Sequence, residues 1–560
     1  YAGGEPSNPS NPGYYGIGCD IGIIKYSQNG LQRLWATYLG GAVSEELPHS
    51  MVCNRNNDLI VMGTTGSSDF PTTLNAYDAT FNGGDTTIYD NVIRFSNGTD
   101  IFVSRLSNDG TQLLASTLIG GSKNDGLNYY GYYMAEGNDS SLYYNYADGA
   151  RGEVICDPAG NVYVGTCSYS PDFPTTPGTF GQNYSGNQEG VVFKLNPTFT
   201  QLLWSTYFGG SEKDAVYSLD IDANNEVYIA GGTTSLNIPT TSGVWKPLAP
   251  GIGKANGFVA HLDANANSVI AASYIGSAEY DQVYFVRVDK LKNVYVTGQT
   301  KAPGTTFIIN AAYNNPNSGQ FITKLPNNLS SPIWSTAFGT GSGVPNISFT
   351  AFSVDFCNRV YISGWGRNWG FNTNQGTYGM DVTNNAYQSQ TDGMDFYLMV
   401  LADDASHLEY ATFFGELHPN GSNAYCGHDH VDGGTSRFDK RGNIYQSVCA
   451  SCGYGCNGFP TYPNPGVWSP NNGGMGTPSE WVCNNALFKF SFALPLTVAD
   501  FQAPSVCINS PTQFTNTSQL ATEYYWNFGD GTYSTDVNPS HTYTQAGTYY
   551  VTLIANNPTS

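Results

Sequence analysis

Trp204-Ser-Thr-Tyr-Phe-Gly-Gly210 is the stretch that decides the fold, because copies of it recur along the chain. Trp35-Ala-Thr-Tyr-Leu-Gly-Gly41 comes before it, and Trp334-Ser-Thr-Ala-Phe-Gly339 comes after it. With the copies at 115–121, 272–276 and 410–415, the phrase occurs six times, at intervals of 63 to 89 residues. A phrase that recurs in this way predicts a repeat architecture.

Two further phrases accompany the copies. Ile155-Cys-Asp-Pro-Ala-Gly-Asn-Val-Tyr-Val164 places apolar residues on both sides of an Asp/Asn/Gly turn, which predicts a β-hairpin. Gly190-Val-Val-Phe-Lys-Leu195 predicts a third strand, and the Trp-Ser-Thr-Tyr phrase predicts a fourth. Four-stranded units in tandem predict the blades of a β-propeller, so the expected fold class is all-β.

Strand counting sets the expected number of blades. The last hairpin, at 434–446, is followed by a third strand at 486–491 but by no fourth strand. A fourth-strand phrase stands at 34–39 instead, and pairing it with 486–491 would close six blades and hide two sheet edges. Seven blades would result if residues 1–26 built extra sheet. We therefore expect a propeller over residues 1–495.

The composition excludes several classes of function. Lys and Arg number 22 against 44 Asp and Glu, a net charge of −22 over 560 residues, so nucleic acid and anionic membranes are poor partners. Without an apolar run of about 18 residues, we do not expect a membrane-embedded protein. Eleven cysteines in a Lys-poor chain favour an oxidising, extracytoplasmic location. The sequence has no Gly-x-Ser-x-Gly, Walker, dinucleotide-binding or His-Glu-x-x-His motif.

Residues 496–560 follow a different pattern. Trp526-Asn-Phe-Gly-Asp-Gly-Thr532 puts Trp526 and Phe528 on one face of a strand, and Gly529-Asp-Gly531 predicts a hairpin turn. With Ala546-Gly-Thr-Tyr-Tyr-Val-Thr-Leu-Ile554, the segment resembles a PKD domain. That resemblance implies an immunoglobulin-like β-sandwich.

The repeats resemble the SBBP β-propeller repeat. Asp69-Phe-Pro-Thr-Thr73 and Asp172-Phe-Pro-Thr-Thr176 also carry this resemblance, which covers about residues 18–492. A propeller followed by a PKD domain is similar to large cell-surface proteins of Bacteroidetes. The resemblance implies export by type IX secretion, a secreted or cell-surface location, and a role in adhesion or gliding motility. It also implies further domains of the same chain after Ser560, and it supplies no catalytic residues.

His428-x-His430-x-Asp432 is the stretch most typical of a metal site. In a strand, positions i, i+2 and i+4 share one face, so two imidazoles and a carboxylate could meet one cation. The alternative is structural: His430 and Asp432 would form hydrogen bonds around the propeller channel or bridge to Arg437.

Acidic residues recur after the Gly-Gly phrase, at Glu45, Asp125, Asp214 and Asp281. Repeat equivalence would gather them on one face of the propeller, where their carboxylates could bind Ca²⁺ as a cofactor. The alternative is a solvated acidic rim without a bound ion.

Cysteines gather in the last repeat. In an exported protein this clustering predicts at least two disulfides, while its spacing leaves zinc or an iron–sulfur cluster as the alternative. Two others, Cys53 and Cys156, occupy the same place in their repeats and are expected to be buried thiols. The disulfide candidates are Cys426, Cys449, Cys452, Cys456 and Cys483.

An insertion in the second repeat is rich in tyrosine, a residue that suits contacts with glycans or proteins. The alternative is an insertion that packs on its own neighbours. Separately, Asp85-Thr86-Thr87 fits a short O-glycosylation pattern, with Thr86 as the acceptor. The candidate contact residues are Tyr129, Tyr130, Tyr132, Tyr133, Tyr143, Tyr144 and Tyr146.

These features favour a non-enzymatic surface protein, with the propeller as an interaction platform and the PKD domain as a spacer. Its expected partners are surface glycans, proteins or copies of itself. Two alternatives remain open: an extracellular hydrolase or lyase acting on polysaccharide, and a structural segment of a surface fibre. Fold alone does not decide between them.

Overall fold

The computed structural model describes residues 19–89, 93–128, 137–146, 148–366, 376–417, 428–431, 433, 436–454, 456–463, 466–471, 481–492, 494 and 497–557. Apart from a three-residue 3-10 turn at Asp148–Ala150, the regular structure in these residues is β-strand, which confirms the all-β class. The chain divides into two compact units. One comprises residues 1–437 and 445–488, and the other comprises residues 438–444 and 489–560.

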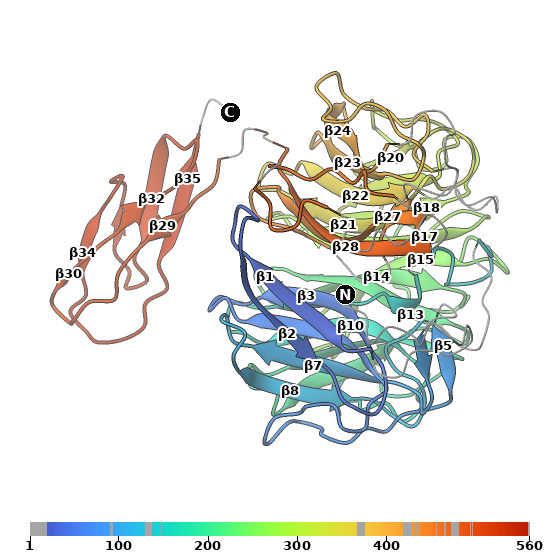
Figure 1. The fold of residues 1–560 in the computed structure, drawn as a ribbon, viewed down its shortest axis with the longest axis horizontal. Coiled ribbons are helices and arrows are strands. Elements are labelled where there is room, and N and C mark those ends of the chain that lie inside the picture. The colour runs from blue at the N-terminus through green and yellow to red at the C-terminus, as the bar shows by residue number, and fades with distance from the viewer. Residues whose placement is uncertain are drawn as a thin grey trace. The chain divides into compact units, whose positions relative to one another are not determined.

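Five complete repeats each fold into one four-stranded antiparallel sheet, as a β-propeller requires (Figure 1). The first strands of neighbouring sheets contact one another and therefore line the middle of the repeat array. The sheets are β3 (Glu46–Cys53), β4 (Leu59–Thr65), β7 (Asp100–Leu106) and β8 (Leu113–Ile119); β9 (Glu153–Cys156), β10 (Val162–Ser168), β11 (Glu189–Leu195) and β12 (Leu202–Phe208); β13 (Asp214–Ile221), β14 (Val227–Thr233), β15 (Asn256–Leu262) and β16 (Val269–Ile275); β17 (Asp281–Val288), β18 (Val294–Thr300), β19 (Gln320–Leu325) and β20 (Trp334–Phe338); and β21 (Ile347–Val354), β22 (Val360–Gly366), β23 (Phe396–Leu401) and β24 (Leu408–Phe414).

The repeated phrases explain this shared geometry. The Asp of the hairpin phrase fixes the turn between the first two strands, since the Asp157 carboxylate accepts a hydrogen bond from the Asn161 backbone N–H at 2.8 Å. Asp289 does the same with Asn293, also at 2.8 Å. The first strand also contains a β-bulge. In β13 the bulge lies between Val216 and Ser218, and it increases the local twist of the strand.

The tryptophan of the Trp-Ser-Thr-Tyr phrase links one sheet to the next. Trp204 is in β12, and its indole N–H donates to the Ala264 carbonyl, in the turn before β16, at 3.1 Å. Trp334 makes the equivalent bond to Asp403 at 3.0 Å. Apolar faces complete the contact, as where Phe208 stacks on Phe258 of the next sheet with ring centroids 4.9 Å apart.

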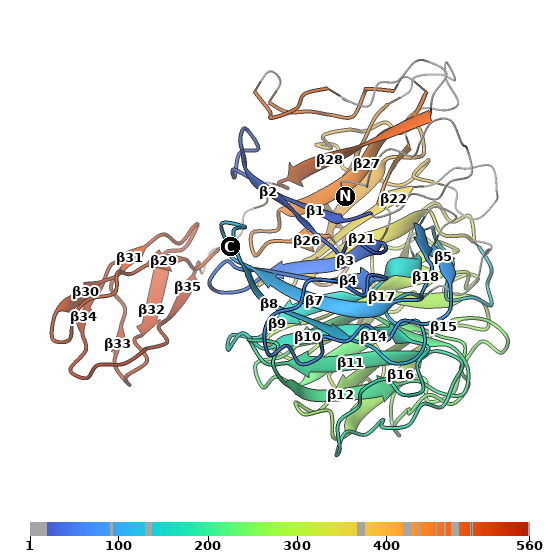
Figure 2. The same ribbon diagram turned by 60° about the horizontal axis from the view of Figure 1, so that its bottom comes forward.

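The predicted six-blade closure is wrong in its strand pairing. In the described sheets, β2 (Arg33–Leu39) pairs with β1 (Ile21–Tyr26), not with β28 (Trp481–Phe490) (Figure 2). The reason is that the sequence of β1 is itself a copy of the third-strand phrase. β1 pairs with β2 in the same register as the third strand β7 pairs with the fourth strand β8, and in both pairs the register shifts at the last residue. Within residues 1–26, the described strand Ile21–Tyr26 therefore builds extra sheet, which was the condition for a seventh blade.

The last repeat is less regular than the others. Its long second strand β27 (Ile444–Tyr454) pairs with β25 (His428–His430), β26 (Arg437–Phe438) and β28. Two short strands, β25 and β26, stand where each complete sheet has a single first strand. A short hairpin, β5 (Thr87–Tyr89) and β6 (Ile93–Phe95), lies in the insertion of the first complete repeat.

The C-terminal unit folds around the predicted aromatic core. Phe514, Trp526, Phe528 and Leu553 are buried together, and the Trp526 indole N–H donates to the Asp536 carbonyl at 2.8 Å. Gly529 and Gly531 have φ of 81° and 88°, values that favour glycine, so the predicted hairpin turn is present. The strands are β29 (Phe501–Gln502), β30 (Pro511–Gln513), β31 (Thr515–Asn516), β32 (Glu523–Asn527), β33 (Tyr533–Ser534), β34 (Ser540–Thr542) and β35 (Thr552–Asn556).

Candidate functional site

The middle of the repeat array holds a buried polar network built on the insertion of the second repeat. The Asp148 carboxylate accepts hydrogen bonds from the Arg151 Nε at 2.7 Å and from the Tyr284 hydroxyl at 3.0 Å. Arg151 also donates to the Phe349 carbonyl at 3.1 Å and lies over the Tyr284 ring, 4.3 Å from its centroid. A single ion pair from the insertion thus joins the first strands β17 and β21.

Amides extend the network to further strands. Asn145 and Gln299 exchange two hydrogen bonds of 3.0 Å, and Gln299 also donates to the Ile347 carbonyl at 2.7 Å. The Tyr217 hydroxyl of β13 donates to Gln282 at 2.8 Å. Burial raises the pKa of Tyr217 and Tyr284 well above the usual range, so both hydroxyls stay protonated.

The predicted tyrosine contact surface is corrected by this arrangement. Tyr143 and Tyr144 are each 1% exposed, and Tyr144 stacks on Tyr280 with centroids 4.0 Å apart. These rings are buried because the insertion folds inward over the first strands, as the alternative interpretation held. Tyr146 is half-buried, whereas Tyr129, Tyr130, Tyr132 and Tyr133 lie outside the described residues.

A second charged cluster surrounds Glu153 of β9. Its carboxylate, 0% exposed, accepts hydrogen bonds from Arg287 of β17 at 2.8 Å and from Arg437 of β26. Arg437 also donates to the Ser50 hydroxyl of β3 at 2.8 Å. Burial alone would raise the pKa of Glu153, but the two guanidinium groups outweigh it and lower that pKa to about 2.

The proposed histidine metal site is only partly described. His430 lies beside the rings of Tyr146 and Trp365, each with centroids 5.6 Å from its own, while the His428 side chain and Asp432 lie outside the described residues. Arg437 bonds to Glu153, Ser50 and backbone carbonyls of β3 and β9. In the described part of the chain, no three His, Cys, Asp or Glu side chains meet in a group that could hold a metal ion. Metal binding by the histidines stays a prediction.

The acidic residues that follow the Gly-Gly phrase do not form a solvated rim. Asp125, Asp214 and Asp281 are 0% exposed and Glu45 is 4% exposed. Asp214 and Asp281 begin the first strands β13 and β17, and Asp125 forms an isolated β-bridge with Ser168 of β10. Asp125, Asp214 and Asp281 each accept a hydrogen bond from a backbone N–H of their own loop, whereas Glu45 accepts one from the Cys19 N–H at 2.6 Å. The Asp214 carboxylate accepts from the Gly210 N–H and the Ser235 hydroxyl, both at 2.8 Å. Burial raises the pKa of Asp214 to about 6 and that of Asp281 to about 7.

The sequence reasoning missed the partners of these residues. Beside two of the predicted residues, Asp125 and Asp214, a second acidic side chain lies next to the same glycine, and it comes from the first residue of a third strand. Glu189 lies beside Asp214 in this way, and Asp100 lies beside Asp125. The signal was present, because an acid or an amide directly precedes the Phe-Val-x-Lys-Leu phrase in repeat after repeat. In the first repeat, Glu46 and not Glu45 occupies the position equivalent to Asp214.

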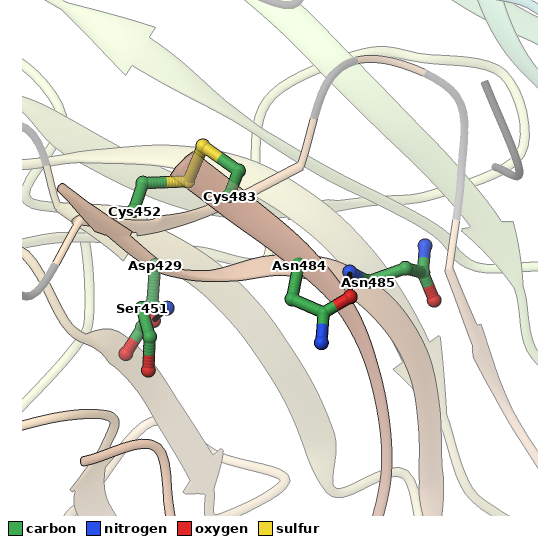
Figure 3. Close-up of a disulfide and its surroundings, with 6 residues drawn as sticks. All are labelled: Asp429, Ser451, Cys452, Cys483, Asn484 and Asn485. Atoms are coloured by element: carbon green, nitrogen blue, oxygen red, sulfur yellow. Dashed lines mark hydrogen bonds between the residues drawn. A yellow bond between two sulfur atoms is a disulfide. The ribbon is translucent and has the colours of Figure 1, made fainter. Parts of the chain in front are cut away.

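Cys452 and Cys483 form a disulfide between β27 and β28, which confirms disulfide bonding within the predicted cluster (Figure 3). Beside it, the Ser451 backbone N–H donates to the Asp429 carboxylate at 2.8 Å. Cys456 is also disulfide-bonded, Cys449 is half-buried in β27, and Cys426 lies outside the described residues.

The remaining two predicted sites have different outcomes. Cys53 is exposed and Cys156 is half-buried, so the expectation of buried thiols is wrong for both. They are accessible because each ends a first strand, where the chain leaves the sheet for the hairpin turn. Thr86 is half-buried and donates to the Ser96 carbonyl at 2.6 Å, and its glycosylation stays a prediction.

Comparisons with known proteins add information on the C-terminal unit. No helix among the described residues is long and apolar enough to cross a membrane. No curated protein matches the chain. Solved structures that resemble it include a protein of unknown function from Bacteroides caccae, at 8% identity and a TM-score of 0.29 over 68% of this chain and 86% of that one. A polysaccharide lyase described as an ulvan lyase aligns at 8% identity and a TM-score of 0.32 over 83% of this chain and 88% of its own. The acylaminoacyl peptidase of Pyrococcus horikoshii aligns at 6% identity and a TM-score of 0.32 over 88% and 52%.

Those structural likenesses are too weak to carry an argument about activity. The family comparison is specific, because the PKD domain family matches residues 497–560. This is the segment whose strands enclose Trp526 and Phe528. The chain therefore carries a PKD domain at residues 497–560, following an all-β repeat unit of propeller type.

Proposed function

We propose that this protein is an extracellular, non-enzymatic interaction module, in which the propeller presents a binding surface and the PKD domain acts as a spacer. The PKD domain supports the extracellular location, because such domains are typical of extracellular proteins. The disulfide between Cys452 and Cys483 supports it as well, since disulfides persist in oxidising compartments. Export by type IX secretion and a role in adhesion or gliding are part of this proposal.

The buried network in the middle of the repeats is the observation that carries the proposal. Asp148 and Tyr284 are 0% exposed, and Arg151 is 3% exposed. A ligand or substrate needs accessible polar groups, but these groups are already bonded to one another. Ligand binding would therefore fall to the outer surfaces of the sheets and their loops.

One exposed aromatic surface suits that role. Trp468 is 50% exposed and Tyr462 is 87% exposed, both in the segment between β27 and β28. The Arg33 guanidinium lies over the Trp468 ring, 5.1 Å from its centroid. Tryptophan, tyrosine and arginine are the residues that most often dominate binding energy at interfaces. An indole ring with a guanidinium over one face also provides apolar area and hydrogen-bond donors for a glycan.

Binding of the purified chain to an array of surface polysaccharides tests the proposal directly. We expect saturable binding whose affinity falls at least tenfold in Trp468→Ala. Leu74→Ala is the control, because Leu74 is 91% exposed but lies outside the surface formed by Trp468, Tyr462 and Arg33, and this variant should bind with wild-type affinity. Light scattering on the same samples measures self-association, which the alternative role as a segment of a surface fibre requires. Release of reducing ends or of unsaturated sugars from any of these polysaccharides would replace the proposal with the enzymatic alternative.

A further inference from the structure

Carboxylates meet in pairs beside the first glycine of the Gly-Gly phrase. One member begins a first strand, lies within it or precedes it, and the other comes from the start of a third strand or the residue before it. The pair beside Gly209 is the tightest: a Cβ added there would lie 2.1 Å from Glu189 Oε2 and 2.5 Å from Asp214 Oδ2. Glycine is needed because any side chain would collide with both carboxylates. The other pairs are Asp20 with Glu46, Asp100 with Asp125, and Asp395 with Asp429.

Each carboxylate of the Glu189–Asp214 pair leaves one oxygen without a hydrogen bond. Glu189 Oε1 accepts from the Ser185 hydroxyl at 2.6 Å, and Asp214 Oδ2 accepts from the Ser235 hydroxyl at 2.8 Å. Glu189 Oε2 and Asp214 Oδ1 accept no hydrogen bond of ordinary geometry, although the two side chains are only 1% and 0% exposed and the Thr233 hydroxyl lies near enough to lower the pKa of Asp214. Within the described residues, no Lys, Arg or His forms an ion pair with either carboxylate. When both carboxylates are ionised, the two buried negative charges lack a neutralising group, which is unfavourable in a medium of low dielectric constant.

A neighbouring sheet shows that the backbone does not require this charge. Beside Gly339, the equivalent positions hold amides, Gln320 and Asn346, whose side-chain oxygens lie 2.7 and 2.6 Å from the added Cβ. The strands β19 and β20 pair there as their equivalents do elsewhere. Uncharged side chains of similar shape therefore fit the same backbone, so the shape of the site alone does not account for the carboxylates at the other positions.

We propose that the Glu189–Asp214 pair binds a Ca²⁺ ion. Ca²⁺ takes carboxylate and carbonyl oxygens in flexible numbers, and its double charge neutralises the pair. The site offers only oxygen ligands, whereas Zn²⁺ prefers nitrogen and sulfur. The Gly210 carbonyl, which accepts from the Ser185 hydroxyl at 2.9 Å, lies in the same loop and is a further oxygen near the pair. The ion would fasten a third strand to the first strand of the next sheet.

The sharpest test converts this pair into the amide pair that the chain already uses beside Gly339. The double variant Glu189→Gln/Asp214→Asn and the wild-type chain are dialysed against Ca²⁺, and bound metal is measured by mass spectrometry. We expect the double variant to retain one Ca²⁺ fewer per chain and to lose part of the rise in melting temperature that Ca²⁺ gives the wild type. In the chelator EGTA, the double variant should be at least as stable as the wild type, since two unneutralised charges are gone.

A second carboxylate pair provides the matched control. Asp222 and Glu226 already share a cation, because the Lys292 ammonium lies 2.6 and 2.8 Å from their oxygens. Asp222→Asn/Glu226→Gln should therefore keep the wild-type Ca²⁺ content. A wild-type chain that retains no Ca²⁺, or whose melting temperature Ca²⁺ leaves unchanged, would overturn the proposal. Full Ca²⁺ content in the Glu189→Gln/Asp214→Asn variant would also overturn it. Should that variant fail to fold, Glu189→Gln alone is measured in the same way.

Discussion

Replacing Glu153 by Gln should weaken the propeller by about 3 kcal/mol. Glutamine keeps the shape of the side chain and an oxygen that can accept from Ser218, so the variant removes little besides the negative charge. Arg287 and Arg437 then face each other across an uncharged group, with side chains only 16% and 24% exposed. Both guanidinium groups would be left largely buried and without their counter-ion.

Two routes give the same magnitude. The pKa of Glu153 falls from its ordinary 4.5 to about 2, and each unit corresponds to about 1.4 kcal/mol in favour of the ionised form, so losing the charge costs roughly 3 kcal/mol. Removing one partner of a buried ion pair independently costs about 3–5 kcal/mol in other proteins. Because the folded-state pKa is depressed, this stability is fully present above about pH 4.5 and is lost as the pH falls towards 2.

The assay is urea unfolding followed by near-ultraviolet circular dichroism at neutral pH and at pH 3. Glu226→Gln is the control: Glu226 also pairs with a cation, Lys292 at 2.8 Å, but it is 26% exposed, so its loss should cost less than about 1 kcal/mol. Glu153→Gln should also be less sensitive to acid than the wild type. Equal losses for the two variants, or a loss below about 1 kcal/mol for Glu153→Gln, would refute the reasoning.

Three further predictions concern separate parts of the chain. Trp526→Ala should cost about 3–5 kcal/mol by opening the sandwich core, and calorimetry should show the PKD transition moving to lower temperature while the propeller transition stays in place. Cys483→Ser opens a loop with a sequence separation of 31 residues, so it should cost about 3–4 kcal/mol. Dithiothreitol should lower the melting temperature of the wild type more than that of the variant, which keeps the disulfide of Cys456. Burial lowers the pKa of His49 to about 3, so protonation of this histidine in the unfolded chain should reduce stability as the pH falls below about 6.5. His49→Gln should make the melting temperature decline less steeply between about pH 6.5 and 4. An unchanged slope would contradict this prediction.

Most of the fold could be predicted because it is built from local rules applied repeatedly. The turn at Asp157, the Trp204 phrase and the strand between them each carry a visible sequence pattern. The pairing of the N-terminal strand could not be predicted in the same way. β1 and β28 both carry the third-strand phrase, so pattern alone leaves β2 with two equivalent partners. Only packing decides between them, and Ile21 and Ile23 of β1 join the core of the first complete sheet.

The sites were harder to predict than the fold for a related reason. The repeat pattern identified Asp214, but not that its partner would be Glu189, because the two positions belong to different phrases that meet only in the folded sheet. The insertion was harder still. Asn145 bonds to Gln299, a separation of 154 residues, and Arg151 bonds to Phe349, a separation of 198. No local pattern marks either contact.

The two charged clusters make the middle of the propeller rigid, and that rigidity bears on function. Arg437 of the last repeat reaches Glu153 and Ser50 of the first two complete sheets, while Arg151 of the insertion reaches β21 on another side. Each contact joins first strands that are distant in sequence, so opening the middle would expose several buried charges at once, at a cost of several kcal/mol for each charge left without its partner. A ligand that had to enter the middle would have to displace these bonds. A ligand at Trp468 would not have to displace these bonds, so its binding should leave the structure of the propeller unchanged. A preformed outer surface of this kind suits an interaction platform, because little has to be ordered when the ligand binds.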